Sequence, residues 1–185
     1  MQVEVYAGTE KVRLYLNDKL VGEMPTAAEQ QRRALFTVPY APGTLKAVGV
    51  NGDREVATNV LQTTGDAVKI RLTADRDVLK ADGGDLAFVT VEAVDAQGRL
   101  QPNAATDIQF SISGPGTIIA VGNGDGASKD SYQANHRALF NGRAQVVIRT
   151  SRTPGSIRLE GNAPGMTAGE ITIRTESGSS GAELQ

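Results

Sequence analysis

The 185-residue sequence contains no cysteine and no tryptophan, one histidine, four tyrosines and four phenylalanines. The absence of cysteine excludes disulfide bonds and thiolate metal sites, and it leaves the redox compartment open. Because His136 is the sole histidine, a histidine-rich metal centre and a Cys–His dyad cannot form. The formal net charge is only −2 and the basic residues form no cluster, so the sequence predicts no nucleic-acid partner.

Long apolar runs and helical periodicity are also missing. No stretch approaches the roughly 18 consecutive apolar residues that a membrane-spanning helix requires, so we expect no membrane partner. Apolar residues do not recur at helical spacing over three turns, whereas short β-rich runs bounded by Gly, Pro, Asn and Asp appear repeatedly. The sequence therefore predicts an all-β protein.

The first half shows two hairpin signals. Residues 12–16 alternate, with Val12, Leu14 and Leu16 on one face. Asn17-Asp18 predicts the turn that follows, because both residue types tolerate positive φ. Asn51-Gly52-Asp53 predicts a tight hairpin turn with φ > 0 at both central positions, joining residues 45–50 to 55–61.

A second series of strands begins after a pause in the pattern near Thr64. Its longest run, residues 86–94, predicts a strand whose core face carries Val89, Val91 and Ala93. About seven short strands within about 110 residues are typical of an immunoglobulin-like sandwich. We therefore predict two tandem immunoglobulin-like β-sandwich domains, residues 1–64 and 65–176, and a flexible tail over 177–185.

Residues 122–142 form the longest stretch without a strand pattern, and loops of this length are usually functional or docked. Sugar sites combine aromatic faces with planar hydrogen-bonding groups, so carbohydrate binding is one interpretation of this loop. The others are that its aromatic residues anchor it to its own sandwich, or that it docks on another domain or subunit. The candidate contact residues are Tyr132, His136, Arg137, Phe140 and Asn141.

Three residues of the same segment, Asn123, Asp125 and Asp130, have the oxygen atoms that calcium loops use. Ala127 falls where a further ligand is needed, so the spacing favours a glycine-rich turn without metal. We predict no cofactor.

The order and spacing of several motifs resemble two domains of bacterial family-two glycoside hydrolases, which are β-galactosidase-like enzymes. Residues 3–22 and 38–49 are similar to the small β-sandwich that follows the catalytic barrel. A second set of segments is similar to the terminal domain of the same enzymes, namely residues 79–91, 113–116, 122–125 and 140–142. Asp18 departs from the glycine usual in the family, and residues 132–136 replace a more basic loop.

This resemblance implies a non-catalytic C-terminal accessory region that braces the catalytic domain or contributes interdomain and subunit contacts. It implies an upstream barrel in the same polypeptide as partner, and a periplasmic or secreted location. The family's catalytic residues lie in that barrel, so none is carried over. The alternatives are a carbohydrate-binding module that uses the 122–142 loop and adhesin-like tandem domains of a surface protein.

The chain's own residues offer no convincing catalytic pair. Glycoside hydrolysis needs two carboxyl groups on opposite sides of the sugar bond. Glu92 and Asp95 are close in sequence, but residues three apart on a strand point to opposite faces. We therefore expect a solvated glutamate and a turn-forming aspartate.

Overall fold

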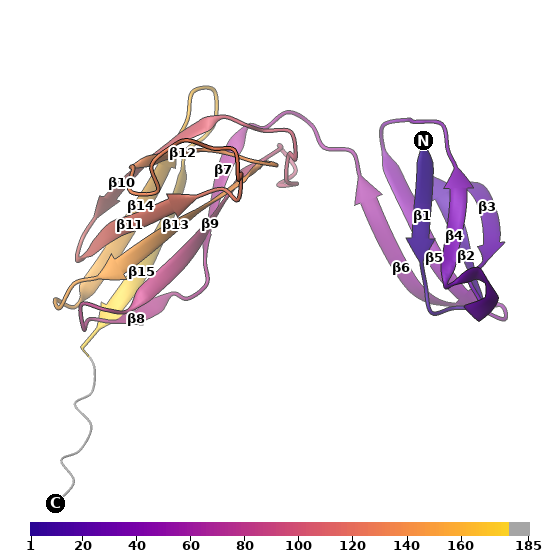
Figure 1. Cartoon of the computed structure of the whole chain (residues 1–185), viewed down its shortest axis with the longest axis horizontal. Coiled ribbons are helices and arrows are strands. Elements are labelled where there is room, and N and C mark those ends of the chain that lie inside the picture. The colour runs from indigo at the N-terminus through magenta and orange to yellow at the C-terminus, as the bar shows by residue number, and fades with distance from the viewer. Residues whose placement is uncertain (178–185) are drawn as a thin grey trace, which may run out of the picture. The chain divides into compact units, whose positions relative to one another are not determined.

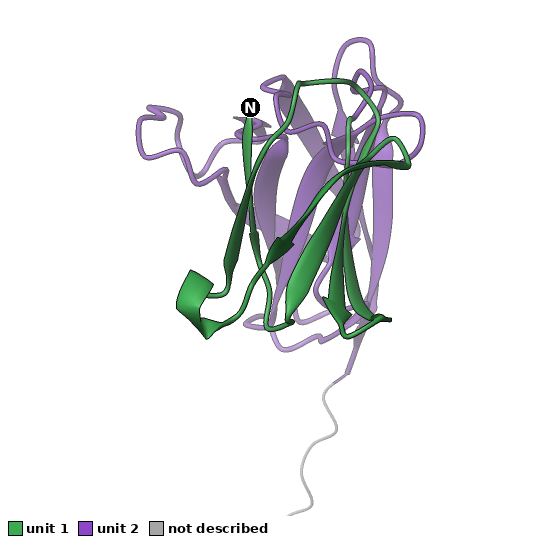
Figure 2. Ribbon diagram, turned by 90° about the vertical axis from the view of Figure 1, so that its right-hand side faces the viewer, with its two compact units in different colours: residues 1–63 green, residues 64–185 purple. Residues whose placement is uncertain are grey.

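The computed structural model describes residues 1–177, which contain fifteen strands and one short 3₁₀ turn. The chain divides into two compact units, unit 1 (residues 1–63) and unit 2, which begins at Thr64 (Figure 2). The prediction of an all-β fold is confirmed. The division falls one residue before the predicted boundary, and the predicted tail lies outside the described residues except for Ser177. Within residues 1–177 no helix is long and apolar enough to cross a bilayer.

Unit 1 packs a two-stranded sheet against a four-stranded one. The small sheet pairs β1 with β4, and the large sheet has the order β3-β2-β5-β6. Val12 and Leu14 of the large sheet bury their side chains against Ala34 and Phe36 of the small sheet. The strands are β1 (Gln2–Tyr6), β2 (Lys11–Leu16), β3 (Lys19–Pro25), β4 (Arg33–Thr37), β5 (Thr44–Asn51) and β6 (Arg54–Gln62), with the 3₁₀ turn at Ala28–Gln30 (Figure 1).

The two predicted hairpins of unit 1 form, one with a different turn. Asn17 and Asp18 join β2 to β3 with φ of 50° and 62°, as predicted. The β5–β6 turn is centred on Gly52-Asp53, because Asn51 still pairs with Arg54. Only Gly52 of that pair has positive φ, so the prediction of two positive φ values is wrong. The Asn51 side chain instead accepts a hydrogen bond from the Glu10 N–H at 2.9 Å.

Unit 2 is a sandwich of two larger sheets, with strand orders β12-β10-β14-β15-β8 and β11-β13-β9-β7. Val89, Val91 and Ala93 of β9 are fully buried between them, as predicted. Neighbouring strands are antiparallel except for β15 and β8. The strands are β7 (Lys69–Ala74), β8 (Val78–Lys80), β9 (Leu86–Val94), β10 (Asp107–Ser113), β11 (Gly116–Gly122), β12 (His136–Ala138), β13 (Arg143–Thr150), β14 (Gly155–Asn162) and β15 (Gly169–Glu176).

Candidate functional site

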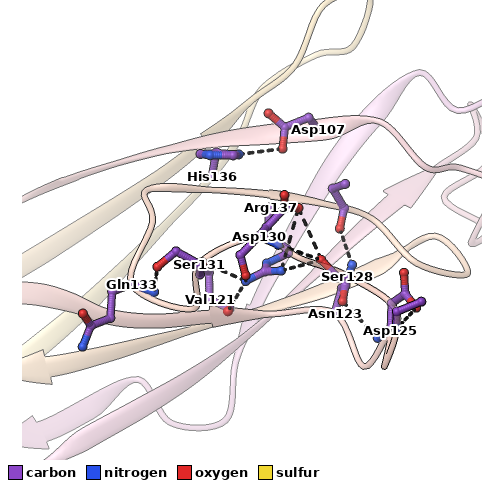
Figure 3. Close-up of polar contacts among 12 residues, drawn as sticks. Asp107, Val121, Asn123, Asp125, Ser128, Asp130, Ser131, Gln133, His136 and Arg137 are labelled. Atoms are coloured by element: carbon purple, nitrogen blue, oxygen red, sulfur yellow. Dashed lines mark hydrogen bonds and ion pairs between the residues drawn. The ribbon is translucent and has the colours of Figure 1, made fainter.

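The segment 122–142 is not strand-free, contrary to the sequence-based prediction. His136–Ala138 form β12, which pairs antiparallel with β10 at the edge of the five-stranded sheet. Pairing to a neighbouring strand stabilises this three-residue stretch, and such pairing leaves little trace in a short sequence window. The irregular part is therefore residues 123–135, which lie between β11 and β12 (Figure 3).

Arg137 holds this irregular segment from inside, and only 1% of its surface is exposed. Its Nη2 donates to the carbonyl oxygens of Val121 at 3.0 Å and Ser131 at 2.9 Å, and its Nη1 donates to Ser128 Oγ at 3.1 Å (Figure 3). The carboxylate of Asp130 lies 3.9 Å from Nη1. A guanidinium committed to its own loop in this way is not available as a contact for a ligand.

The three calcium candidates serve as turn residues. Asn123 Oδ1 accepts from the Asp125 N–H at 3.0 Å, and Asp125 Oδ1 accepts from the Ala127 N–H at 2.9 Å. Asp130 Oδ2 lies 3.4 Å from Ser128 Oγ. Among residues 1–177, no three His, Cys, Asp or Glu side chains form a group that could hold a metal ion.

Tyr132 is exposed, at 65%. The Arg137 guanidinium lies 5.1 Å from the centre of its ring, which is cation–π distance. The Val121 N–H donates to the Tyr132 carbonyl at 2.7 Å. The ring edge lies over Gly122, where a side-chain Cβ would be 3.7 Å from Tyr132 Cε1.

The remaining three candidates lie in other surroundings. His136 Nδ1 is 3.0 Å from an Asp107 carboxylate oxygen (Figure 3). Asn141 and Gly142 are the central residues of a hairpin closed by Phe140 and Arg143, with φ of 51° and 75°. The Asn-Gly dipeptide is the signal that could have identified this turn from the sequence. The structure therefore brings Tyr132 and Arg137 together but not the full candidate set.

The two carboxylates considered for catalysis are both held by neighbouring groups, Glu92 by arginines of the adjacent strands and Asp95 by its own turn. Glu92 lies between Arg71, at 2.6 Å, and Arg143, at 3.0 Å, and its side chain is only 12% exposed, so the expectation of a solvated glutamate is wrong. Burial opposes ionisation of Glu92, but hydrogen bonds from the two arginines outweigh it and hold its pKa below the usual value.

Asp95 forms a turn, as expected, and is 2% exposed. Burial opposes its ionisation, but the N–H groups of Gly65, Arg99 and Gln97 and the Arg99 guanidinium donate to its carboxylate and lower its pKa to about 2.

Two surface grooves were missed by the sequence reasoning. One, of about 220 Å³, lies in unit 1 between β1 and the strands β5 and β6, and Val5, Tyr6, Leu45 and Leu61 are among its lining residues. The other, of about 360 Å³, lies on unit 2 beside residues 122–124. Its lining residues are Thr90, Gly122, Asn123, Gly124, Arg143, Ala144 and Gln145. Grooves of this kind arise from packing between strands distant in sequence, so local patterns do not reveal them.

Comparison with known proteins gives a consistent result across the chain. The family described as glycoside hydrolase family 2 C-terminal domain 5 matches residues 70–172, and a domain of unknown function (DUF4982) matches residues 1–57. Beta-galactosidase BoGH2A of Bacteroides ovatus is 34% identical over 92% of this chain and 20% of its own length. A beta-glucuronidase of Formosa agariphila is 30% identical over 92% of this chain and 17% of its own length.

The crystal structure of a glycosyl hydrolase family 2 member from Bacteroides cellulosilyticus superposes with a TM-score of 0.92 and 37% identity. That likeness covers 95% of this chain and 23% of the other. The chain thus spans about a fifth of the length of the curated relatives it matches.

Proposed function

Since this chain belongs to the C-terminal domains of glycoside hydrolase family 2, we propose that it is the non-catalytic accessory region of a larger, β-galactosidase-like glycoside hydrolase. In this role unit 1 docks against the neighbouring part of the same polypeptide and braces the catalytic domain. The observation that carries the bracing role is that the two-stranded sheet of unit 1 leaves β6 of the four-stranded sheet exposed.

The titration behaviour of the carboxyl groups supports a non-catalytic role. A glycosidase general acid is a carboxyl group whose pKa is raised, so that it is protonated at the working pH. In the described part of the chain, every carboxyl group with a shifted pKa has it lowered. These groups are Glu23, Asp82, Asp85, Glu92 and Asp95.

The groove of unit 1 supports docking. The two-stranded sheet leaves β6 uncovered, and all nine residues of that strand are exposed. Tyr6 is 68% and Leu61 64% exposed, and both line the groove with the half-buried Val3 and Val5. Covering such apolar surface is favourable by about 25 cal/mol per Å². The relatives are about five times longer than this chain, so a covalently attached segment is the occupant that we assign to this groove.

A matched pair of lysine substitutions on β6 tests the docking. Leu61 lines the groove, whereas its neighbour Val60, 46% exposed, points to the opposite face of the strand. We expect Leu61→Lys to lower the free energy of unfolding of the parent enzyme by about 2–3 kcal/mol and Val60→Lys to leave it nearly unchanged. In the isolated chain both substitutions should have little effect on the free energy of unfolding. Equal effects of the two in the parent enzyme would contradict the docking.

The absence of catalysis has its own test. The isolated chain should leave chromogenic β-galactosides and β-glucuronides uncleaved. Turnover that a Glu92→Gln substitution abolishes would show that the chain itself is catalytic. The periplasmic or secreted location stays a prediction, and fractionation of bacteria that express the parent protein would test it.

A further inference from the structure

The outer face of the four-stranded sheet of unit 2 carries a row of small and polar groups. Gly122 of β11 pairs with Gln145 of β13, and Gln145 pairs with Thr90 of β9. The neighbouring residues Val121, Val146 and Val89 are buried in the core. Successive side chains point to opposite faces of a strand, so the row from Gly122 to Thr90 faces solvent. This row forms the floor of the 360 Å³ groove.

Tyr132 lies next to this surface, at Gly122. Gly122 has no side chain, and the Tyr132 ring edge lies over it at van der Waals distance. The groove therefore begins directly beside an aromatic ring that is 65% exposed. Aromatic rings bind the apolar C–H faces of sugar rings by the same dispersion and burial that drive other aromatic contacts.

The ring is also held in place before any ligand arrives. The buried Arg137 guanidinium contacts Tyr132 at 5.1 Å, and the Tyr132 carbonyl accepts the Val121 N–H. Immobilising a side chain on binding costs about 0.5–1.5 kcal/mol, and a ring that is already positioned avoids that cost. Arg137 is thus a positioning residue for this surface.

Hydrogen-bonding groups suited to sugar hydroxyls line the rest of the groove. The Gln145 amide is exposed and the Thr90 hydroxyl half-exposed. The Arg143 guanidinium is 58% exposed and uses its Nε to bind Glu92 at 3.0 Å. An amide and a guanidinium are planar groups that offer paired donors or acceptors. Glu92 pairs with both Arg143 and Arg71, so it neutralises one of these two positive charges and leaves the Arg143 guanidinium partly free to donate hydrogen bonds.

From this arrangement we propose that the outer face of the β11-β13-β9 sheet, beside Tyr132, binds an oligosaccharide. The sugar ring stacks on Tyr132, and Gln145, Thr90 and Arg143 hydrogen-bond its hydroxyl groups. Of the five contact residues suggested by the sequence, only Tyr132 belongs to this surface, with Arg137 acting through it. The proposal does not depend on docking by unit 1.

Nuclear magnetic resonance titration of the whole chain tests this site, with β-1,4-galactotetraose, cellotetraose and xylotetraose as probes. We expect at least one of them to shift the backbone amide signals of Gly122, Gly124 and Gln145. Tyr132→Ala should weaken binding about tenfold. Tyr40→Ala is the matched control, because Tyr40 is 69% exposed in unit 1, and it should not change the affinity.

A second variant covers the case in which Tyr132→Ala disturbs its loop. Gln145→Ala removes an exposed amide on a regular strand and should weaken binding about threefold or more without altering the other amide signals. The proposal is overturned if none of the three tetrasaccharides shifts these signals, or if both variants bind as tightly as the unchanged chain. Neither outcome bears on the Leu61→Lys test, which concerns unit 1 in the parent enzyme.

Discussion

The two units differ in how completely they enclose a core. Unit 2 buries sixteen apolar side chains in one cluster between a five-stranded and a four-stranded sheet, whereas unit 1 buries five between a two-stranded and a four-stranded sheet. Both units are built from similar alternating strands. The difference shows that alternation determines which face of a strand is apolar, while the number of facing strands determines whether that face is covered.

Large-to-small substitutions in the two cores should show the largest difference. Ile148 in unit 2 and Leu14 in unit 1 are at most 1% exposed, but Leu14 also lines the groove. We expect Ile148→Ala to lower the free energy of unfolding by about 4 kcal/mol and Leu14→Ala to lower it by about 2–3 kcal/mol. The cavity that Leu14→Ala leaves lies beside an open groove, so water can enter it or neighbouring side chains can relax into it. Urea unfolding followed by circular dichroism and by amide exchange in each unit measures both. Equal losses of unfolding free energy in the two variants would contradict the expected difference between the two cores.

The buried arginine of unit 2 should have the next largest effect. Arg137→Met removes the guanidinium that donates to the carbonyls of Val121 and Ser131, although the Ala134 N–H still donates to Ser131, so we expect a loss of about 2–3 kcal/mol. Arg149→Met in β13 is the control, since Arg149 is exposed, and should change stability by less than about 0.5 kcal/mol. Urea unfolding of the whole chain distinguishes the two. If Arg137→Met left the stability unchanged, Arg137 would not be needed to stabilise the loop.

Two hairpin glycines give a smaller contrast. Gly142 has φ of 75°, and a Cβ there would lie 2.3 Å from the Gln101 carbonyl oxygen, whereas Gly52 has φ of 58° and open space around it. Gly52→Ala should lower the stability by about 1 kcal/mol, because only the backbone conformation is unfavourable for alanine there. Gly142→Ala should lower it by about 2 kcal/mol or more. Thermal unfolding of the two variants measures the difference. If Gly52→Ala were the more costly, the packing of unit 2 around its turn would be looser than the structure shows.

The acid dependence of unit 2 should be the most restricted effect, because it is confined to low pH. Asp95 has a pKa of about 2 in the folded chain, against about 3.9 in unfolded chains. Its stabilising contribution is therefore complete above pH 4 to 5 and is lost as the pH falls toward 2. Asp95→Asn should remove this part of the pH dependence from the unfolding of unit 2. An unchanged acid profile would show that other carboxyl groups cause it.

The regular strands were predictable from the sequence, and the contacts between distant segments were not. Val89, Val91 and Ala93 were identified because alternation is a local property of the chain. β12 was missed because three residues become a strand only through pairing with β10. The burial of Arg137 could not be foreseen, since arginine is usually exposed and its partners Val121 and Ser131 converge on it only in the fold. The same reason explains why the contact between Gly122 and the Tyr132 ring was not predicted.

The two-stranded sheet of unit 1 affects how the isolated chain behaves in solution. In the described part of the molecule, β1 and β4 pair only with each other, so each presents one row of unpaired backbone N–H and C=O groups. Such open edges template the addition of a strand from another molecule. A chain cut from its parent enzyme should therefore self-associate as its concentration rises, through the margins of this sheet.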